Sequence, residues 1–120
     1  MVAPVNTFPK DERICGKKAI SLLMDKGHWG NTSCIRYCWM PGTTQKSRIL
    51  VSVPKRHFKR AVKRNLLKRR MREAYRLNKS ILSSAVADIM LVYASSQVQP
   101  YPQVEEDVKN LLERIESHAK

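Results

Sequence analysis

The chain has 120 residues, which is enough for about one domain with a buried core. Its hydrophobic share of 42% and charged share of 28% are those of a globular protein and argue against a disordered one. No run approaches the ~18 consecutive apolar residues of a membrane span, and the first residues lack the apolar core of a secretory signal. The formal net charge of +13 instead points to a polyanionic partner: nucleic acid, an anionic membrane surface or an acidic protein.

The first predicted elements are an arm, a helix and two strands. Residues 1–9 are expected to form an extended arm, and the apolar positions of 13–26 indicate a short helix that Gly27 ends. In 33–40, apolar and polar residues alternate as in a half-buried strand. After a turn at Pro41-Gly42, residues 48–53 form a second strand.

The second half of the chain predicts a helix, a strand and a helix. A basic helix lies within residues 55–79, and the uniformly apolar run 88–94 is typical of a strand covered on both faces. The last helix starts after Pro102, with apolar residues at helical spacing and three acids in its first turn. This order predicts an α/β fold, an α+β two-layer sandwich with helices on one small sheet, in a single domain over 1–120. The strand–helix–strand segment within it predicts a parallel pair.

The three cysteines, Cys15, Cys34 and Cys38, are expected to be reduced thiols of a cytoplasmic protein. Cys34 and Cys38 with His28 have a weak resemblance to a zinc site. The second pair of ligands that a closed site needs is missing. The sequence therefore predicts no metal site in the chain. If residues 34 and 38 both belong to a strand, they simply share one of its faces.

The basic helix carries the strongest functional signal. Residues 59–76 hold nine lysines and arginines but one acid, Glu73. Five polar residues fall within an arc of roughly 100°: Asn65, Lys68, Arg69, Arg72 and Arg76. An apolar set lies on the other side: Leu66, Leu67, Met71, Ala74 and Leu77. A merely solvated face would mix both signs of charge, and arginine forks suit bidentate phosphate contacts, so the helix is predicted to bind nucleic acid.

A loop ahead of the helix extends this cationic stripe through Lys55, Arg56, Lys59 and Arg60. A helix that enters the major groove of DNA usually has a helix-turn-helix partner or a dimerising segment, and neither is visible here. A basic helix set between two strands favours shape-directed contact with folded RNA.

At these residues the sequence resembles the bacterial ribonuclease P protein component. The resemblance rests on Arg64-Asn65-x-x-Lys68-Arg69-x-x-Arg72-Glu73, preceded by Lys55-Arg56 and Ala61-Val62. Further similarity covers nearly the whole chain, at Phe8-Pro9-Lys10, Glu12-Arg13, Lys17-Lys18, Gly27 and Asp88-Ile89-x-Leu91-Val92.

The resemblance implies a left-handed β-α-β crossover around the basic helix, an exception to the usual right-handed rule. It also implies a subunit that binds a catalytic RNA and the 5′ leader of precursor tRNA to promote leader removal. The RNA and its magnesium ions would perform the hydrolysis, so no cofactor is expected to be intrinsic to the chain. No DNA and no membrane partner is expected.

Carried over by position, the RNA-facing residues would be Arg64, Asn65, Lys68, Arg69 and Arg72, with Arg60 and Lys63 beside them. A cleft between the first helix and the sheet would hold the leader by aromatic stacking. Ile20 and Met24 stand where the family commonly has phenylalanine, and Tyr37 and Trp39 could supply the stacking if their strand face lines the cleft. Alternatively, Ile35, Tyr37 and Trp39 are core residues, and for Ile20 and Met24 the core interpretation is the favoured one. Lys59 replaces a usual glycine, and Ser95 or Ser96 a frequent arginine.

Catalytic residues are not predicted in this chain. A protein nuclease needs convergent carboxylates or an acid–base pair, and between Lys26 and Val104 the only acids are Glu73 and Asp88. Two alternatives remain: a ribosomal or general RNA-binding protein with no role in cleavage, and an autonomous metal-dependent endonuclease, against which the scarcity of acids argues.

Overall fold

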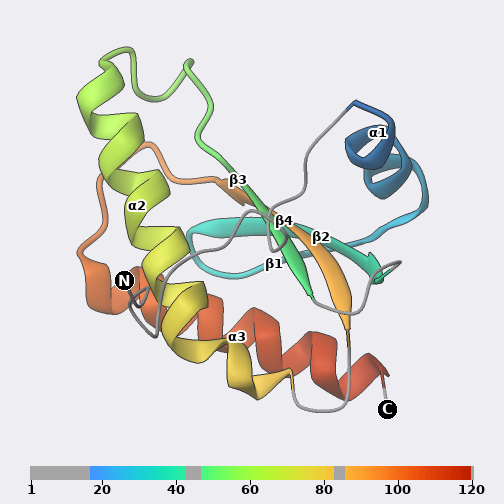
Figure 1. The fold of residues 1–120 in the computed structure, drawn as a ribbon. Coiled ribbons are helices and arrows are strands. Elements are labelled where there is room, and N and C mark those ends of the chain that lie inside the picture. Colours follow the sequence, from blue (N-terminus) through green and yellow to red (C-terminus); the bar gives the residue numbers. More distant parts are fainter. Residues whose placement is uncertain (1–16, 43–46, 83–85, 120) are drawn as a thin grey trace, which may run out of the picture.

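A computed structural model describes residues 17–42, 47–82 and 86–119 (Figure 1). The predicted arm 1–9, residues 13–16 of the first helix, and Cys15 lie outside the described residues. The elements in chain order are α1 (Lys17–Lys26), β1 (His28–Asn31), β2 (Ile35–Pro41), β3 (Arg48–Ser52), α2 (Ala61–Asn78), the 3₁₀ turn η2 (Lys79–Ile81), β4 (Ala87–Tyr93) and α3 (Tyr101–Ala119).

The four strands form one sheet in the order β1-β2-β4-β3. β3 and β4 are parallel, with α2 between them in the chain, so the predicted parallel pair is confirmed. The strands predicted at 33–40 and 48–53 do not pair with each other, because β4 lies between them and pairs antiparallel with β2. β1 was not predicted: it pairs with β2 and forms the edge opposite to β3.

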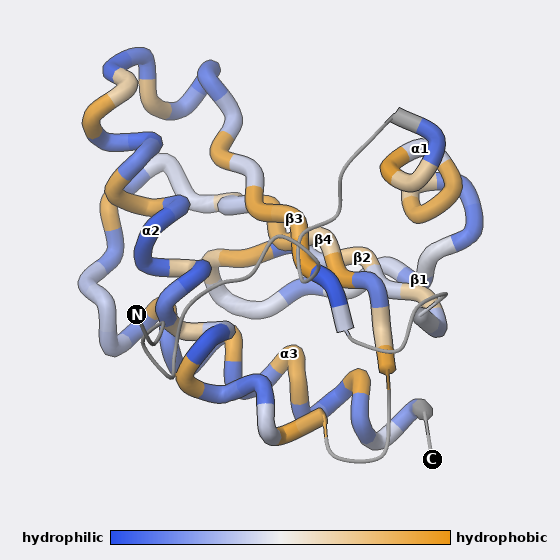
Figure 2. Tube along the Cα trace, in the orientation of Figure 1, coloured by the Kyte–Doolittle hydropathy of each residue, from blue (hydrophilic) through white to orange (hydrophobic). Residues whose placement is uncertain are grey.

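Helices cover both faces of this sheet, which confirms the mixed α/β class. The larger cluster joins odd-numbered strand residues such as Ile35, Ile49 and Leu91 to the buried faces of α2 and α3. A smaller cluster on the opposite face joins Cys38 and Met90 to α1. Figure 1 shows α1 (blue) on the far side of the strands from α3 (red), so α1 adds a third layer to the predicted sandwich. In Figure 2 the two long helices alternate hydrophilic and hydrophobic residues, as amphipathic helices do.

Gly27 ends α1 and brings the helix close to the sheet. Its N–H donates to the carbonyl of Leu23 at 2.8 Å. A Cβ atom at this position would lie 2.3 Å from Sγ of Cys38, which no real contact allows. The glycine is therefore needed for close approach as well as for ending the helix, and it sets the distance between α1 and β2.

The last helix is tied to the β1–β2 turn by one buried carboxylate. Asp107, 2% exposed, accepts hydrogen bonds from the N–H of Cys34 at 2.7 Å, from its thiol at 2.8 Å and from the hydroxyl of Ser33 at 2.9 Å. Burial raises the pKa of the Cys34 thiol to about 12, and the hydrogen bond to Asp107 adds to that effect, so the thiol keeps the proton that it donates. α3 starts at Tyr101, which places Asp107 and its acidic neighbours in the second turn instead of the predicted first.

The two described cysteines do not share a face, contrary to the prediction. Cys34 precedes β2 and belongs to the larger cluster, whereas Cys38 lies within β2 and packs against α1. The alternation of strand side chains does not apply to residue 34, because it lies in the turn. This separation removes the Cys34–Cys38 pair as a metal-binding unit.

Candidate nucleic-acid interface

α2 exposes the face that its sequence predicted and buries a slightly different set. The buried residues are Leu67, Met71, Ala74 and Tyr75, which pack on β-sheet residues and α3. Leu77, predicted to dock, is 48% exposed, and Leu66 is only partly buried. Because Tyr75 occupies the buried stripe, the helix is rotated slightly from the predicted position, and its cationic side still faces away from the core.

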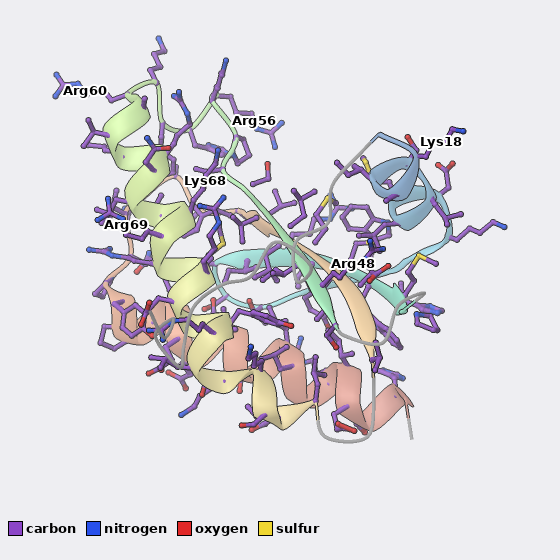
Figure 3. The ribbon with its side chains drawn as sticks, in the orientation of Figure 1. Lys18, Arg48, Arg56, Arg60, Lys68 and Arg69 are labelled. Atoms are coloured by element: carbon purple, nitrogen blue, oxygen red, sulfur yellow. The ribbon has the colours of Figure 1, made fainter. Side chains whose placement is uncertain are left out.

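The structure brings the predicted RNA-binding residues together on α2 and the loop before it (Figure 3). The exposed members are Lys55, Arg56, Lys59, Arg60, Lys63, Asn65, Arg69 and Arg72. The partly buried members are Arg64, Lys68 and Arg76. We call these eleven residues the cationic surface. Figure 3 shows Arg56 and Arg60 at the loop and the start of the helix, with Lys68 and Arg69 further along it.

Two arginines of the cationic surface are bound within the chain. The Nη1 group of Arg64 donates to the carbonyls of Phe58 at 2.7 Å and Lys59 at 2.8 Å, so this side chain shapes the preceding loop. The guanidinium of Arg76 forms an ion pair with Glu73 one turn earlier. Arg69 and Arg72, by contrast, point into solvent. Arg69 and Arg72 are therefore freer to bind phosphates than Arg64 and Arg76, whose guanidinium groups already bind acceptors within the chain.

The two central acids do not form a catalytic pair. Asp88 is buried, and both of its oxygens accept hydrogen bonds from Arg48, at 3.0 Å from Nε and 2.8 Å from Nη2. Glu73 is held by Arg76 on α2. In the part of the chain that the structure describes, no three His, Cys, Asp or Glu side chains converge as metal ligands. These carboxylates stabilise the fold and are not arranged for nuclease chemistry.

The four residues predicted to line a leader cleft lie on two different faces of the sheet. Ile20 packs with Leu23 and Cys38 on the α1 face, and Met24 of α1 is 49% exposed there. Tyr37 and Trp39, at 6% and 8% exposure, belong to the cluster with α2 and α3. Strand side chains alternate between faces, so the even-numbered residues of β2 face α1 and the odd-numbered ones do not. Of the two alternatives for Tyr37 and Trp39, their burial in this cluster agrees with the second, that they are core residues.

Three exposed residues near these surfaces were not predicted as site residues. Lys18 on α1 was noted only as part of the family resemblance, and Arg36 on β2 and Trp29 on β1 were given no role. Trp29 lies two residues after Gly27, which ends α1. An aromatic residue at this place in a basic protein is the sequence feature that could have indicated a contact with RNA. Arg36 had no signal beyond its charge.

None of the described helices has the length and hydropathy needed to cross a membrane.

Comparison with known proteins gives a consistent result. The model of the family "Ribonuclease P" matches residues 8–116. A ribonuclease P protein component of Porphyromonas gingivalis strain W83 is 33% identical over 121 residues, covering 93% of this chain and 88% of that protein. One from Chlorobaculum tepidum is 41% identical over 88 residues, covering 68% of this chain and 57% of that protein.

Two solved structures share the fold. The Staphylococcus aureus RNase P protein superposes with a TM-score of 0.76 at 22% identity, covering 87% of this chain and 94% of that one. The protein from Thermotoga maritima gives 0.76 at 24% identity, covering 86% and 96%. The family match over nearly the whole chain and the fold agree: the chain belongs to the family of bacterial ribonuclease P protein components.

Proposed function

We propose that the cationic surface binds the catalytic RNA of ribonuclease P and that the α1 face of the sheet binds the 5′ leader of precursor tRNA. Membership of the family makes the chain a protein subunit of ribonuclease P that takes part in the 5′ processing of tRNA, with catalysis by the RNA. What supports the docking proposal is the concentration of exposed cations on α2 and its loop, where Glu73 is the single acid within residues 59–76.

The cationic surface supplies affinity by releasing counterions from RNA. Each neutralised phosphate steepens the logarithmic salt dependence of binding by roughly 0.9 on a duplex and ~0.7 on a single strand. A rigid helix presents its cations at fixed spacing, because Leu67, Met71 and Ala74 anchor its other side in the core. The protein can therefore screen phosphates that are crowded together in a folded RNA, which lowers the demand for divalent ions.

The leader proposal now rests on Ile20 and Met24 and on the sheet beneath α1. Met24 and Leu22 are exposed apolar side chains on this helix, and the adjoining Lys18 and Lys26 are exposed cations. Apolar surface beside cations is what a flexible single strand needs for base and phosphate contacts. Tyr37 and Trp39 have no part in this cleft.

Magnesium ions are implied by the family. The described side chains do not fit a resident magnesium site, since no three acidic or histidine ligands converge and Mg²⁺ is usually held by carboxylates together with phosphates and water. We expect the ions to be held mainly by the RNA partner, so that this chain itself performs no step of the hydrolysis.

The assignment is tested by adding the purified protein to its cognate catalytic RNA at low magnesium and measuring leader removal. We expect faster cleavage than with RNA alone, and no stimulation would reject the assignment. A second measurement compares the holoenzyme's affinity for precursor tRNA with that for the same tRNA lacking a leader. Equal affinities would favour a general RNA-binding protein without a role in leader recognition.

A further inference from the structure

A cavity of about 410 Å³ lies where the β1–β2 hairpin meets the C-terminal end of α3. The described residues that line it all carry rings: His28, Trp29, Tyr37, Trp39 and His118. β1 is the sheet edge opposite to β3, so this cavity is distinct from the cationic surface, which follows β3. The volume falls within the range of about 300–1,000 Å³ that is usual for small-ligand sites.

The cavity has a fixed floor and a polar rim. Tyr37 and Trp39 are almost fully buried and belong to the core. The imidazole of His28 lies 5.1 Å from the ring of Trp39, and that of His118 lies 6.4 Å from it, measured between centroids. Both histidines are exposed. Flat rings beneath and imidazole nitrogens above suit a flat ligand that carries hydrogen-bonding groups on its edge.

One cation lies on the cavity's side of the sheet. Arg36 is not part of it: its guanidinium lies 4.5 Å from the ring centroid of Trp29, on the α1 face that both share with Cys38. Nη1 of Arg114 on α3 donates to the carbonyl of Asn31 at 2.6 Å, at the end of β1. Arg114 is exposed and lies one helical turn before His118, so it can offer its remaining N–H groups to a phosphate. A flat ring flanked by phosphates is the chemistry of a nucleotide within a strand.

We propose that this cavity binds a single unpaired nucleobase of RNA, with Arg114 contacting a neighbouring phosphate. Stacking on aromatic rings needs no particular base, and unpaired bases are the ones a protein can reach in folded RNA. The inference rests on the proposed function only in that the chain acts on RNA. It adds a contact at the sheet edge opposite to β3, away from α2.

The first test uses the full chain and short single-stranded RNA oligomers. One set carries all its bases, and a matched set of equal length has abasic residues, which retain the phosphates. The chain has two tryptophans, and both line the cavity. We expect base-bearing oligomers to quench tryptophan fluorescence and to bind more tightly than abasic ones. Equal affinity and equal quenching for the two sets would overturn the proposal.

The second test uses His28→Ala and His118→Ala, at an exposed edge strand and an exposed helix end. Loss of one of these rings beside Trp39 is expected to weaken binding of base-bearing oligomers about 5- to 150-fold and to leave abasic oligomers unaffected. His28→Phe should keep most of the affinity. Val98→Ala removes an exposed apolar side chain elsewhere and is the matched control. Wild-type affinity in both His28→Ala and His118→Ala would refute the site.

Two further arms identify where the nucleobase comes from. His118→Ala is titrated with the catalytic RNA alone, and its holoenzyme is then titrated with precursor tRNAs whose leaders differ in length. Weakening in the first arm assigns the base to the catalytic RNA, and weakening confined to long leaders assigns it to the substrate. Unchanged affinity in both arms overturns the proposal. The α2 variants described below test the proposed function separately, so failure of the cavity and failure of the cationic surface can be told apart.

Discussion

Neutralising Arg69 and Arg72 together should change how ribonuclease P assembly responds to salt. Both side chains are exposed on α2, whereas Arg64 is hydrogen-bonded to backbone carbonyls and Arg76 to Glu73. The double variant Arg69→Gln, Arg72→Gln keeps long polar side chains on the helix and removes two positive charges. Because neither side chain is buried in the core, we expect thermal unfolding to stay close to that of the wild type.

The size of the effect follows from counterion release. Removing two phosphate contacts makes the slope of log K against log salt shallower by about 1.8 on duplex RNA and about 1.4 on single strands. When salt is raised from roughly 0.1 to 0.4 M, a slope difference of 1.8 lowers the ratio of wild-type affinity to double-variant affinity about 12-fold. The assay is a titration of catalytic RNA with protein at several monovalent salt concentrations.

A matched control separates a local contact from a general loss of charge. Lys109→Gln removes an exposed cation from α3, away from the cationic surface, and its slope should equal that of the wild type. Arg76→Gln should change the slope by less than one full contact, because Glu73 already binds that guanidinium. If the double variant kept the wild-type slope, or Lys109→Gln changed it equally per charge, the docking of α2 on the RNA would be wrong.

Three further predictions concern the fold that supports these surfaces. Asp107→Ala leaves the buried N–H of Cys34 without its acceptor and should cost about 1–3 kcal/mol in denaturant unfolding, with the exposed neighbour Glu106→Ala as a near-neutral control. Burial alone raises the pKa of Asp107, but hydrogen bonds from Cys34 and its neighbours outweigh it and hold the pKa below its usual value. Stability from this group is therefore present above about pH 4 and lost as pH falls through the lowered pKa. In acid titrations Asp107→Asn should lose less stability than the wild type. Trp39→Ala should cost about 3–5 kcal/mol as a core truncation, and a stable variant that failed only in leader binding would contradict its placement.

The helical periodicity of α2 was enough to predict its two sides. Charge and apolar residues segregate at 3.6-residue spacing, so Arg69 and Arg72 were placed in solvent and Leu67 and Met71 in the core, as observed. The sequence could not show that Arg64 turns back to the loop, because that contact depends on where the chain before the helix runs.

The strands show where pattern reasoning stops. Alternation separated Tyr37 and Trp39 from Cys38, yet it could not say which face meets α1, since helices cover both sides of this sheet. β1 escaped prediction because its four residues, HWGN, include a glycine and lack alternation. The neighbours of β4 also depend on tertiary packing, and no local signal indicated that it lies between β2 and β3.

The position of β4 has a consequence for the order of events during synthesis. About 35 residues separate Ser52, where β3 ends, from Ala87, where β4 begins, so at roughly 5–20 residues per second the ribosome needs about 2–7 s to make that stretch. Until then β3 lacks the strand with which it pairs. The arginine-rich residues of α2 are also made before β4 and α3, against which the buried side of α2 packs. In this state the basic segment of the nascent chain is not yet packed on the sheet and can bind nearby RNA through its charge. Such early binding would compete with the completion of the sheet.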